Sequence, residues 1–272
     1  FSGGMDSLLG AISLVDSERR PLLVSQGSPK EITPQQDLAL ALGLDAHRFE
    51  GRVNERWRAP YEPSTRARSI LFFAYGAVAA SALNLNEVIV PENALIAINP
   101  PFTRRRTGSL STRTTHPHFL SELSDILAAV GVNVAIRNPF AAKTKGEMIL
   151  AADRGNLPPL RAASYSCGKG KRLNRQCGRC IPCLIRRASF AKAEVEDASD
   201  YYWLNLAQTA GSDDVLAART AVARLDRFAS SRDLEKWAAM SGPLPKEAAE
   251  REAVVAAVGR GVGELKQLFS TL

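Results

Sequence analysis

The chain opens with a glycine-rich segment, Ser2-Gly3-Gly4-Met5-Asp6-Ser7, that runs directly into an apolar stretch with helical spacing. Glycines let a backbone approach a phosphate closely, and hydroxyls with free N–H groups at a helix start bind oxyanions. Asp6 would not contact a phosphate productively by itself, so we expect a bridging Mg²⁺ beside it. The alternative is a simple turn in which Ser7 or Asp6 caps the helix. We predict a phosphate-binding loop, because five such positions seldom coincide by chance.

Strand-like and helix-like segments alternate after this loop. Short apolar runs that read as strands lie at 22–26, 46–50, 87–90 and 132–137, and helical patterns at about 65–85 and 119–130 separate them. This order predicts an α/β fold with a parallel sheet and helices on both faces. A phosphate loop in such a fold follows a strand, so we expect a strand before Phe1.

Four cysteines follow within a short stretch, at Cys167, Cys177, Cys180 and Cys183. Their clustering points to metal and a reducing compartment rather than to a disulfide framework. Cysteines at this spacing can converge tetrahedrally on Zn²⁺, and four thiolates leave no open position, which predicts a structural metal. An iron–sulfur cluster, a redox pair and free thiols are the alternatives.

The composition shifts after the cysteines. Residues 200–272 are rich in Ala, Arg, Glu and Leu and predict a helical subdomain. We therefore expect a nucleotide-binding α/β domain at 1–163, a Cys₄ zinc segment at 164–195 and a helical C-terminal subdomain at 196–272.

Charge and hydropathy set limits on partners and location. The net charge of +7 favours anionic partners such as nucleotides, pyrophosphate or RNA, although a soluble basic enzyme with no macromolecular target fits equally. The longest uncharged run, Ser69–Leu85, is too short and too polar for a spanning helix. We expect it to be a helix buried on both sides, in a cytoplasmic protein without a membrane segment.

The loop and the cysteine set together resemble the 7-cyano-7-deazaguanine synthase (QueC) family of PP-loop ATP pyrophosphatases. That family joins an SGGxDS loop to a Ser-Cys…Cys-Gly-x-Cys-x-x-Cys set in the same order, and here Ser166-Cys167 and Cys177–Cys183 match it. Arg68-Ser69 is similar to its Arg-Asn pair, and Thr144–Met148 to its Thr-Lys-x-Glu-Ile segment. The plain alternatives are a capping box at Thr144 and Glu147 and a solvated helix-start arginine at Arg68.

The segment 91–117 departs from that family. It resembles instead the QueC-like proteins of bacterial anti-phage operons, the QatC group. Ligands of open α/β sheets bind beyond the carboxyl ends of strands, which is where this segment belongs. Arg106, Arg113 and His116 are therefore candidates to hold an anionic substrate or phosphate, with a polar surface loop as the alternative.

The resemblance implies ATP, Mg²⁺ and Zn²⁺ as cofactors. Ser2, Gly3, Gly4, Asp6 and Ser7 would hold pyrophosphate and metal, Arg68, Lys145 and Arg113 would act in catalysis, and Arg106 and His116 would bind substrate. A deazaguanine-type carboxylate would be adenylated and passed to a nitrogen nucleophile. The changed segment favours a defence enzyme with a protein or nucleic-acid acceptor. A housekeeping queuosine synthase and a non-enzymatic nucleotide-binding module are the alternatives, and the oligomeric state is open.

Overall fold

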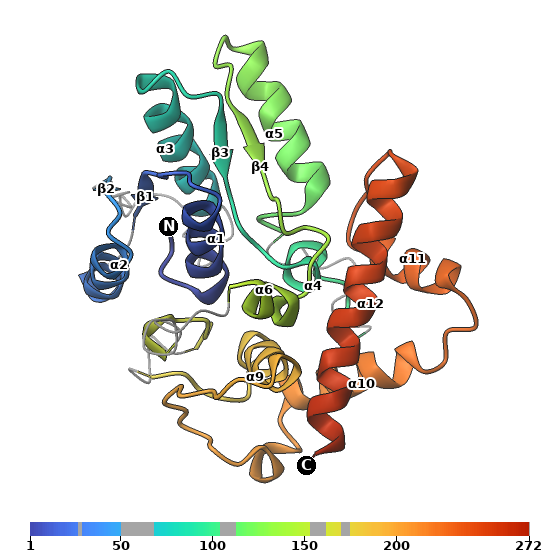
Figure 1. Ribbon diagram of the computed structural model, residues 1–272. Helices are drawn as coiled ribbons and strands as arrows, with labels where there is room; N and C mark the ends of the chain where they lie inside the picture. Colours follow the sequence, from blue (N-terminus) through green and yellow to red (C-terminus); the bar gives the residue numbers. More distant parts are fainter. Residues whose placement is uncertain (27–28, 50–67, 104–112, 153–161, 170–174, 272) are drawn as a thin grey trace, which may run out of the picture.

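The computed structural model describes residues 1–26, 29–49, 68–103, 113–152, 162–169 and 175–271. Strands and helices alternate in the first half of the chain (Figure 1). The elements there are α1 (Met5–Asp16), β1 (Leu23–Ser25), α2 (Pro29–Ala41), β2 (Ala46–Arg48), α3 (Arg68–Ala82), β3 (Glu87–Ile89), α4 (Ala94–Ile98), α5 (Pro117–Ala129), β4 (Ala135–Arg137) and α6 (Lys145–Ala151).

The second half of the described chain is helical. It contains α9 (Ile181–Ala193), the 3₁₀ turn η2 (Leu206–Thr209), α10 (Asp213–Leu225), α11 (Ser231–Ala239) and α12 (Ala248–Ser270). The helical C-terminal extension is therefore confirmed. Helix α12 forms because apolar residues recur on one face, and Val254, Val258, Val262 and Leu265 on that face are fully buried.

The strands are parallel, as predicted, but they form two pairs. Strand β1 pairs with β2 from Leu23 opposite Ala46, and β3 pairs with β4 from Glu87 opposite Ala135. Helix α3 packs on β3 and α5 packs on β4. Each strand lies within one of the four predicted runs, so the α/β class with parallel strands is confirmed, while the expected single sheet is divided among the described residues.

A cleft of about 460 Å³ separates the two strand pairs. Residues of β1, β3, α1 and α3 line it, together with Phe1. The amino group of Phe1 donates a hydrogen bond to the Val24 carbonyl of β1. Our expectation of a strand before Phe1 stays a prediction.

Helix α3 corrects one expectation from the sequence. It covers most of the uncharged run Ser69–Leu85, which we expected to be buried on both sides. Phe73 and Ala77 are buried, whereas Ile70 and Val78 are half exposed, because α3 has neighbours on one side only among the described residues. No helix in the described ranges is long and apolar enough to cross a membrane.

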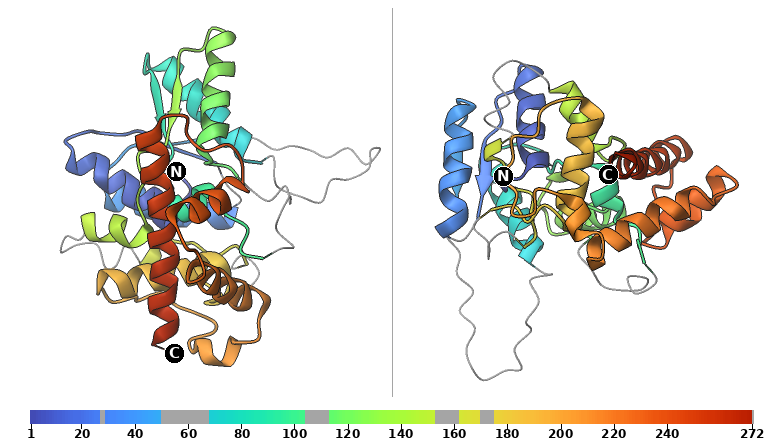
Figure 2. Two further views of the ribbon diagram at one scale, coloured as in Figure 1. Left: turned by 90° about the vertical axis from the view of Figure 1, so that its right-hand side faces the viewer. Right: turned by 90° about the horizontal axis from the view of Figure 1, so that it is seen from below.

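The largest apolar core lies in the C-terminal half. Helices α9, α10, α11 and α12 pack around it, and α4 of the α/β part inserts Leu95 and Ile98 into it. Figure 2 shows α12 beside α10 and α11, running from the middle of the molecule to the end where the C-terminus lies. The α/β part holds several smaller clusters instead, the main one around Leu8, Leu9 and Ile149.

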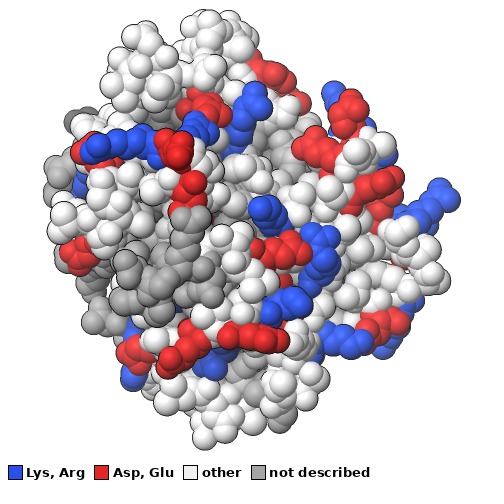
Figure 3. Space-filling model, in the orientation of Figure 1, with Lys and Arg blue, Asp and Glu red and all other residues white. Residues whose placement is uncertain are grey.

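Charges along α12 are largely paired. Arg251 contacts Glu235 at 3.1 Å, Arg260 contacts Glu147 at 2.6 Å and Lys266 contacts Asp226 at 2.6 Å. Figure 3 shows basic and acidic side chains next to one another across this face. The net positive charge of the chain is therefore not gathered into one basic patch on this face.

Candidate nucleotide site and metal centre

The glycine-rich segment forms a loop that enters α1. Gly3 has φ +74°, in the left-handed region that favours glycine, and a Cβ there would lie 3.2 Å from the Gln35 side chain. The Gly4 N–H donates to Ser2 Oγ at 3.2 Å, and Ser7 Oγ donates to the Gly4 carbonyl at 2.9 Å. No side chain caps α1, so the first-turn amides keep their capacity to bind an oxyanion.

Asp6, in the first turn of α1, is the centre of a buried polar cluster. Its Oδ2 lies 2.6 Å from Lys145 Nζ, and its Oδ1 accepts a hydrogen bond of 2.9 Å from Asn93 Nδ2. Burial raises the pKa of Asp6, but the charge and hydrogen bond of Lys145 outweigh it, so the pKa lies below its usual value. The structure therefore brings an ionised Asp6 and the predicted Lys145 together.

Glu92 lies beside this cluster. Its pKa is raised well above the usual value, first by burial and then by the negative charge of Asp6. The Asn138 side chain binds both backbone polar groups of Glu92: it accepts a hydrogen bond from the N–H at 3.2 Å and donates one to the carbonyl at 2.8 Å. Two carboxyl groups share one site here, and a divalent cation would relieve their repulsion.

Lys145 is the first residue of α6 and is almost fully buried. A capping box fixes this helix start: Thr144 Oγ1 accepts from the Glu147 N–H at 3.0 Å, and Glu147 accepts from the Thr144 N–H at 2.9 Å. The capping-box alternative is thus present, and it also directs Lys145 toward Asp6.

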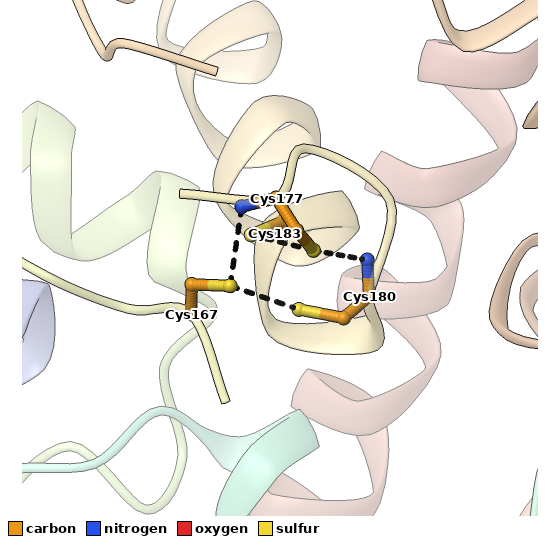
Figure 4. A group of neighbouring side chains, drawn as sticks. All are labelled: Cys167, Cys177, Cys180 and Cys183. Carbon is orange, nitrogen blue, oxygen red and sulfur yellow. Dashed lines mark hydrogen bonds between the residues drawn. The ribbon is translucent and has the colours of Figure 1, made fainter. Parts of the chain in front are cut away.

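The four cysteines converge, as Figure 4 shows. Their sulfur atoms are buried and lie within 4.8 Å of one another. The Cys167–Cys180 and Cys177–Cys183 sulfur separations are 3.8 and 3.9 Å. Tetrahedral zinc with bonds of about 2.3 Å places its sulfur ligands about 3.8 Å apart, so this set fits zinc. It is the one such group of potential metal ligands within the described ranges.

Local geometry explains how the cysteines meet. Gly178 has φ +83°, and a Cβ there would lie 2.5 Å from the Trp203 carbonyl, so only glycine fits this turn. Cys180 is the N-cap of α9, which starts with a proline in its first turn, and Cys183 follows one turn later.

The metal centre and the loop are connected through the segment before Cys167. The Tyr165 N–H donates to the Gly3 carbonyl at 2.9 Å. Arg186 of α9 is fully buried, and its guanidinium donates to Ser199 at 2.8 Å and to Ser164 Oγ at 3.0 Å. The segment that leads to Cys167 therefore contacts both the glycine-rich loop and helix α9.

The remaining predicted site residues are more widely placed. Arg106 lies outside the described residues, and Arg68 is the first residue of α3 with its side chain also outside them. Arg113 is partly buried and its Nε has no hydrogen-bond partner among the described residues. Roles for these arginines stay predictions.

His116 was expected to hold an anionic substrate or phosphate, and that role stays a prediction. It is the N-cap of α5, almost fully buried, and lies against Gly242 of the C-terminal half. Burial and then the charge of Arg113 lower its pKa to about 4, so the imidazole is neutral at pH 7. In this state it can offer a hydrogen bond but no charge to a substrate.

Sequence reasoning missed Glu92, Asn93 and Glu264 as contributors to the site. Glu92 and Asn93 follow β3 after two intervening residues, and their position near the carboxyl end of a parallel strand was an available signal. Glu264, on α12, contacts Thr144 and gave no signal, because nothing in the sequence relates α12 to α6.

Comparison with known proteins places these features in a family. The family model described as "Queuosine biosynthesis protein QueC" matches residues 54–194, just over half of the chain. The match contains Lys145 and all four cysteines. It ends before α10, so the C-terminal helices lie outside it.

Individual relatives agree with this match. The chain is 33% identical over 139 residues to a 7-cyano-7-deazaguanine synthase of Desulfitobacterium hafniense, covering 50% of this chain and 54% of that protein. It is 29% identical over 136 residues to the synthase of Ectopseudomonas mendocina, covering 50% and 57%. For the synthase of Nitrosospira multiformis the identity is 24% over 227 residues, covering 74% and 93%.

The share of each chain that is aligned decides whether the family can be stated. In three of the alignments the chain spans about half the length of the curated relatives it matches. The family match nevertheless covers more than half of this chain, including its cysteine set and the α6 lysine. The chain belongs to the QueC family.

Proposed function

We propose that the chain is an AMP-forming, ATP-dependent enzyme that converts a 7-deazaguanine carboxylate to the nitrile. Its relatives carry the name 7-cyano-7-deazaguanine synthase. The observation that carries this proposal is the contact of Lys145 with Asp6 of the glycine-rich loop, at 2.6 Å. A buried cation beside a loop of free amides is suited to a polyphosphate rather than to a neutral ligand.

The loop would hold the β,γ-pyrophosphate of ATP. The first-turn amides of α1 and the hydroxyls of Ser2 and Ser7 supply the donors. Asp6 and Glu92 would hold Mg²⁺, which neutralises phosphate charge when bound. Lys145 then faces the same phosphates and stabilises the charge that develops during transfer.

The chemistry begins with the substrate carboxylate. Its oxygen attacks the α-phosphorus of ATP, pyrophosphate leaves, and an acyl-adenylate forms. Ammonia attacks the acyl carbon and expels AMP, giving an amide. The amide oxygen attacks the α-phosphorus of a second ATP and expels a second pyrophosphate. Loss of AMP, which keeps the former amide oxygen, together with the two N–H protons leaves the nitrile.

The metal centre would have a structural role in this enzyme. Four thiolates saturate a tetrahedral zinc and leave no position for substrate. The hydrogen bond from Tyr165 to Gly3 gives this structural metal a direct link to the loop.

A defence enzyme that passes the activated carboxylate to a protein or nucleic-acid amine is the second candidate. One observation favours it: α10, α11 and α12 lie outside the family match, and α12 packs on α4, α6 and α9. The names of the relatives favour the synthase, so we place the synthase first.

Product analysis tests the proposal. The full chain is incubated with Mg-ATP and 7-carboxy-7-deazaguanine, with and without ammonium, and nucleotides and bases are identified by mass spectrometry. AMP together with the nitrile supports the synthase. AMP with an adenylate or amide that goes no further supports the second candidate. A folded, zinc-loaded chain that forms no AMP contradicts both.

A further inference from the structure

Helix α12 reaches the nucleotide site from the opposite end of the sequence. Glu264 is almost fully buried in the middle of this helix. Its carboxylate accepts a hydrogen bond from Thr144 Oγ1 and lies 3.4 Å from the Gly146 N–H. Thr144 and Gly146 flank Lys145 on both sides, so one carboxylate of α12 fixes the backbone that carries the lysine.

A second side chain of α12 holds the same segment. Arg260, one turn before Glu264, donates to Glu147 Oε1 at 2.6 Å and to the Ala142 carbonyl at 3.2 Å. Glu147 is the acidic member of the capping box. Arg260 and Glu264 therefore both form hydrogen bonds with residues at the start of α6.

The other partner of Asp6 also rests on α12. Asn93 caps α4 by accepting from the Ile96 N–H at 3.2 Å, and it donates to Asp6. The next turn of α4 packs on α12 at Gly261, where a Cβ would lie only 3.2 Å from Leu95. Both groups that hold Asp6 are thus carried by short helices resting on α12.

We propose that α12 positions Lys145 against the nucleotide loop, with Glu264 as the positioning residue of the proposed AMP-forming site. Short helices such as α4 and α6 gain little stability of their own, so their orientation depends on what they pack against. Glu264 acts through the Thr144 hydroxyl and the Gly146 N–H and does not touch substrate. This inference rests on the proposed function only in assuming that the loop binds ATP.

A double-mutant cycle on ATP affinity tests the inference without requiring turnover. We expect Glu264→Ala to weaken ATP binding about tenfold, since small displacements of a charged group are costly. In a Lys145→Ala background the same change should have almost no effect, because its route to the phosphates is gone. Calorimetric titration of the full chain with ATP measures both, and Glu252→Ala, an exposed glutamate of α12, is the matched control.

Substitutions at two glycines test the same inference independently and leave every charged side chain in place. A Cβ at Gly146 would lie 2.5 Å from Glu264 Oε1, whereas a Cβ at Gly263 of α12 meets nothing within 4 Å. Gly146→Ala should therefore weaken ATP binding, and Gly263→Ala should leave it unchanged. Urea unfolding of each variant separates a change in affinity from a loss of folded protein.

The outcomes are distinct. Affinity lost with Glu264→Ala and restored toward the parent value by Glu264→Gln, with non-additivity against Lys145→Ala, supports positioning. Equal losses in both backgrounds would overturn it and leave Glu264 as a stabilising contact only. If the parent chain binds ATP normally but makes no AMP, the proposed reaction fails while the inference stands. A parent chain that binds no ATP overturns both.

Discussion

The cysteine cluster and the polar cluster at the glycine-rich loop are assembled over very different sequence distances. All four cysteines lie between Cys167 and Cys183, and a glycine turn and one helix start bring them together. Asp6 instead meets Asn93, which is 87 residues away, and Lys145, which lies further still. A local motif carries its own geometry, whereas a dispersed site depends on the packing of elements that its motif does not contain.

Removing the metal should have the largest effect and would break the comparison most directly. We expect Cys183→Ser to lose zinc and to lower the free energy of unfolding by several kcal/mol, because metal binding contributes to folding. Elemental analysis and urea unfolding measure the two quantities, with Ser189→Ala on the same helix as control. A zinc-free variant as stable as the parent would show that the cysteines do not need a metal.

Breaking the link between the two sites should come next. Arg186→Ala removes a buried guanidinium that binds Ser164 and Ser199. We expect a loss of about 3–5 kcal/mol of stability, since buried polar partners are left behind. Arg175→Ala, at an exposed position, should cost under about 1 kcal/mol. Similar unfolding curves for the two variants would show that the hydrogen bonds of Arg186 to Ser164 and Ser199 do not stabilise the fold.

His116 allows a smaller test that depends on pH. Its pKa falls from 6.5 in the unfolded chain to about 4 in the folded one. The unfolded state therefore binds the proton first, and stability is lost as pH falls from 6.5 toward 4. We expect His116→Gln to remove about 2 kcal/mol of this acid sensitivity.

The neighbouring His118 is the control for that measurement. It is exposed and is the smallest of the three causes that lower the pKa of His116, so His118→Gln should alter the pH profile of unfolding much less than His116→Gln. A parent profile that is flat from pH 6.5 to 4, or one equally altered by both variants, would contradict a buried, neutral His116.

Asn93 should give the smallest change in stability. Asn93→Ala removes the cap of α4 and the amide that binds Asp6. The lost cap should cost about 1 kcal/mol. Thermal unfolding measures the loss, and an Asn205→Ala variant, which removes the cap of η2 far from the loop, shows the cost of a cap alone. If Asn93→Ala lowers ATP affinity much more than it lowers stability, the main role of Asn93 is its contact with Asp6 and not the cap of α4.

The sequence predicts the local parts of this molecule well. Parallel strands, the helical C-terminal half and the cysteine cluster follow from periodicity and spacing, and all are confirmed. Lys145 was named from a short matching segment, and the structure places it on Asp6. Its catalytic role stays a prediction.

What the sequence could not give is the packing of distant elements. Nothing in the spacing of α12 relates Glu264 to Thr144, because that contact depends on how two helices cross. For the same reason nothing in the sequence indicated that His116, a candidate to hold an anionic substrate, is buried against Gly242. The two-sided burial expected for α3 failed because its alanine-rich side alone is packed.

The central claim is that the Asp6–Lys145 pair serves an AMP-forming reaction, and nucleotide product analysis tests it most directly. The full chain, Lys145→Ala and Lys143→Ala are each incubated with Mg-ATP, ammonium and 7-carboxy-7-deazaguanine, and the nucleotides are separated and quantified. The account predicts AMP and pyrophosphate, a loss of at least about 100-fold in Lys145→Ala, and a rate within about twofold for the exposed neighbour Lys143→Ala. Release of ADP and phosphate, or full AMP formation by Lys145→Ala, would contradict it.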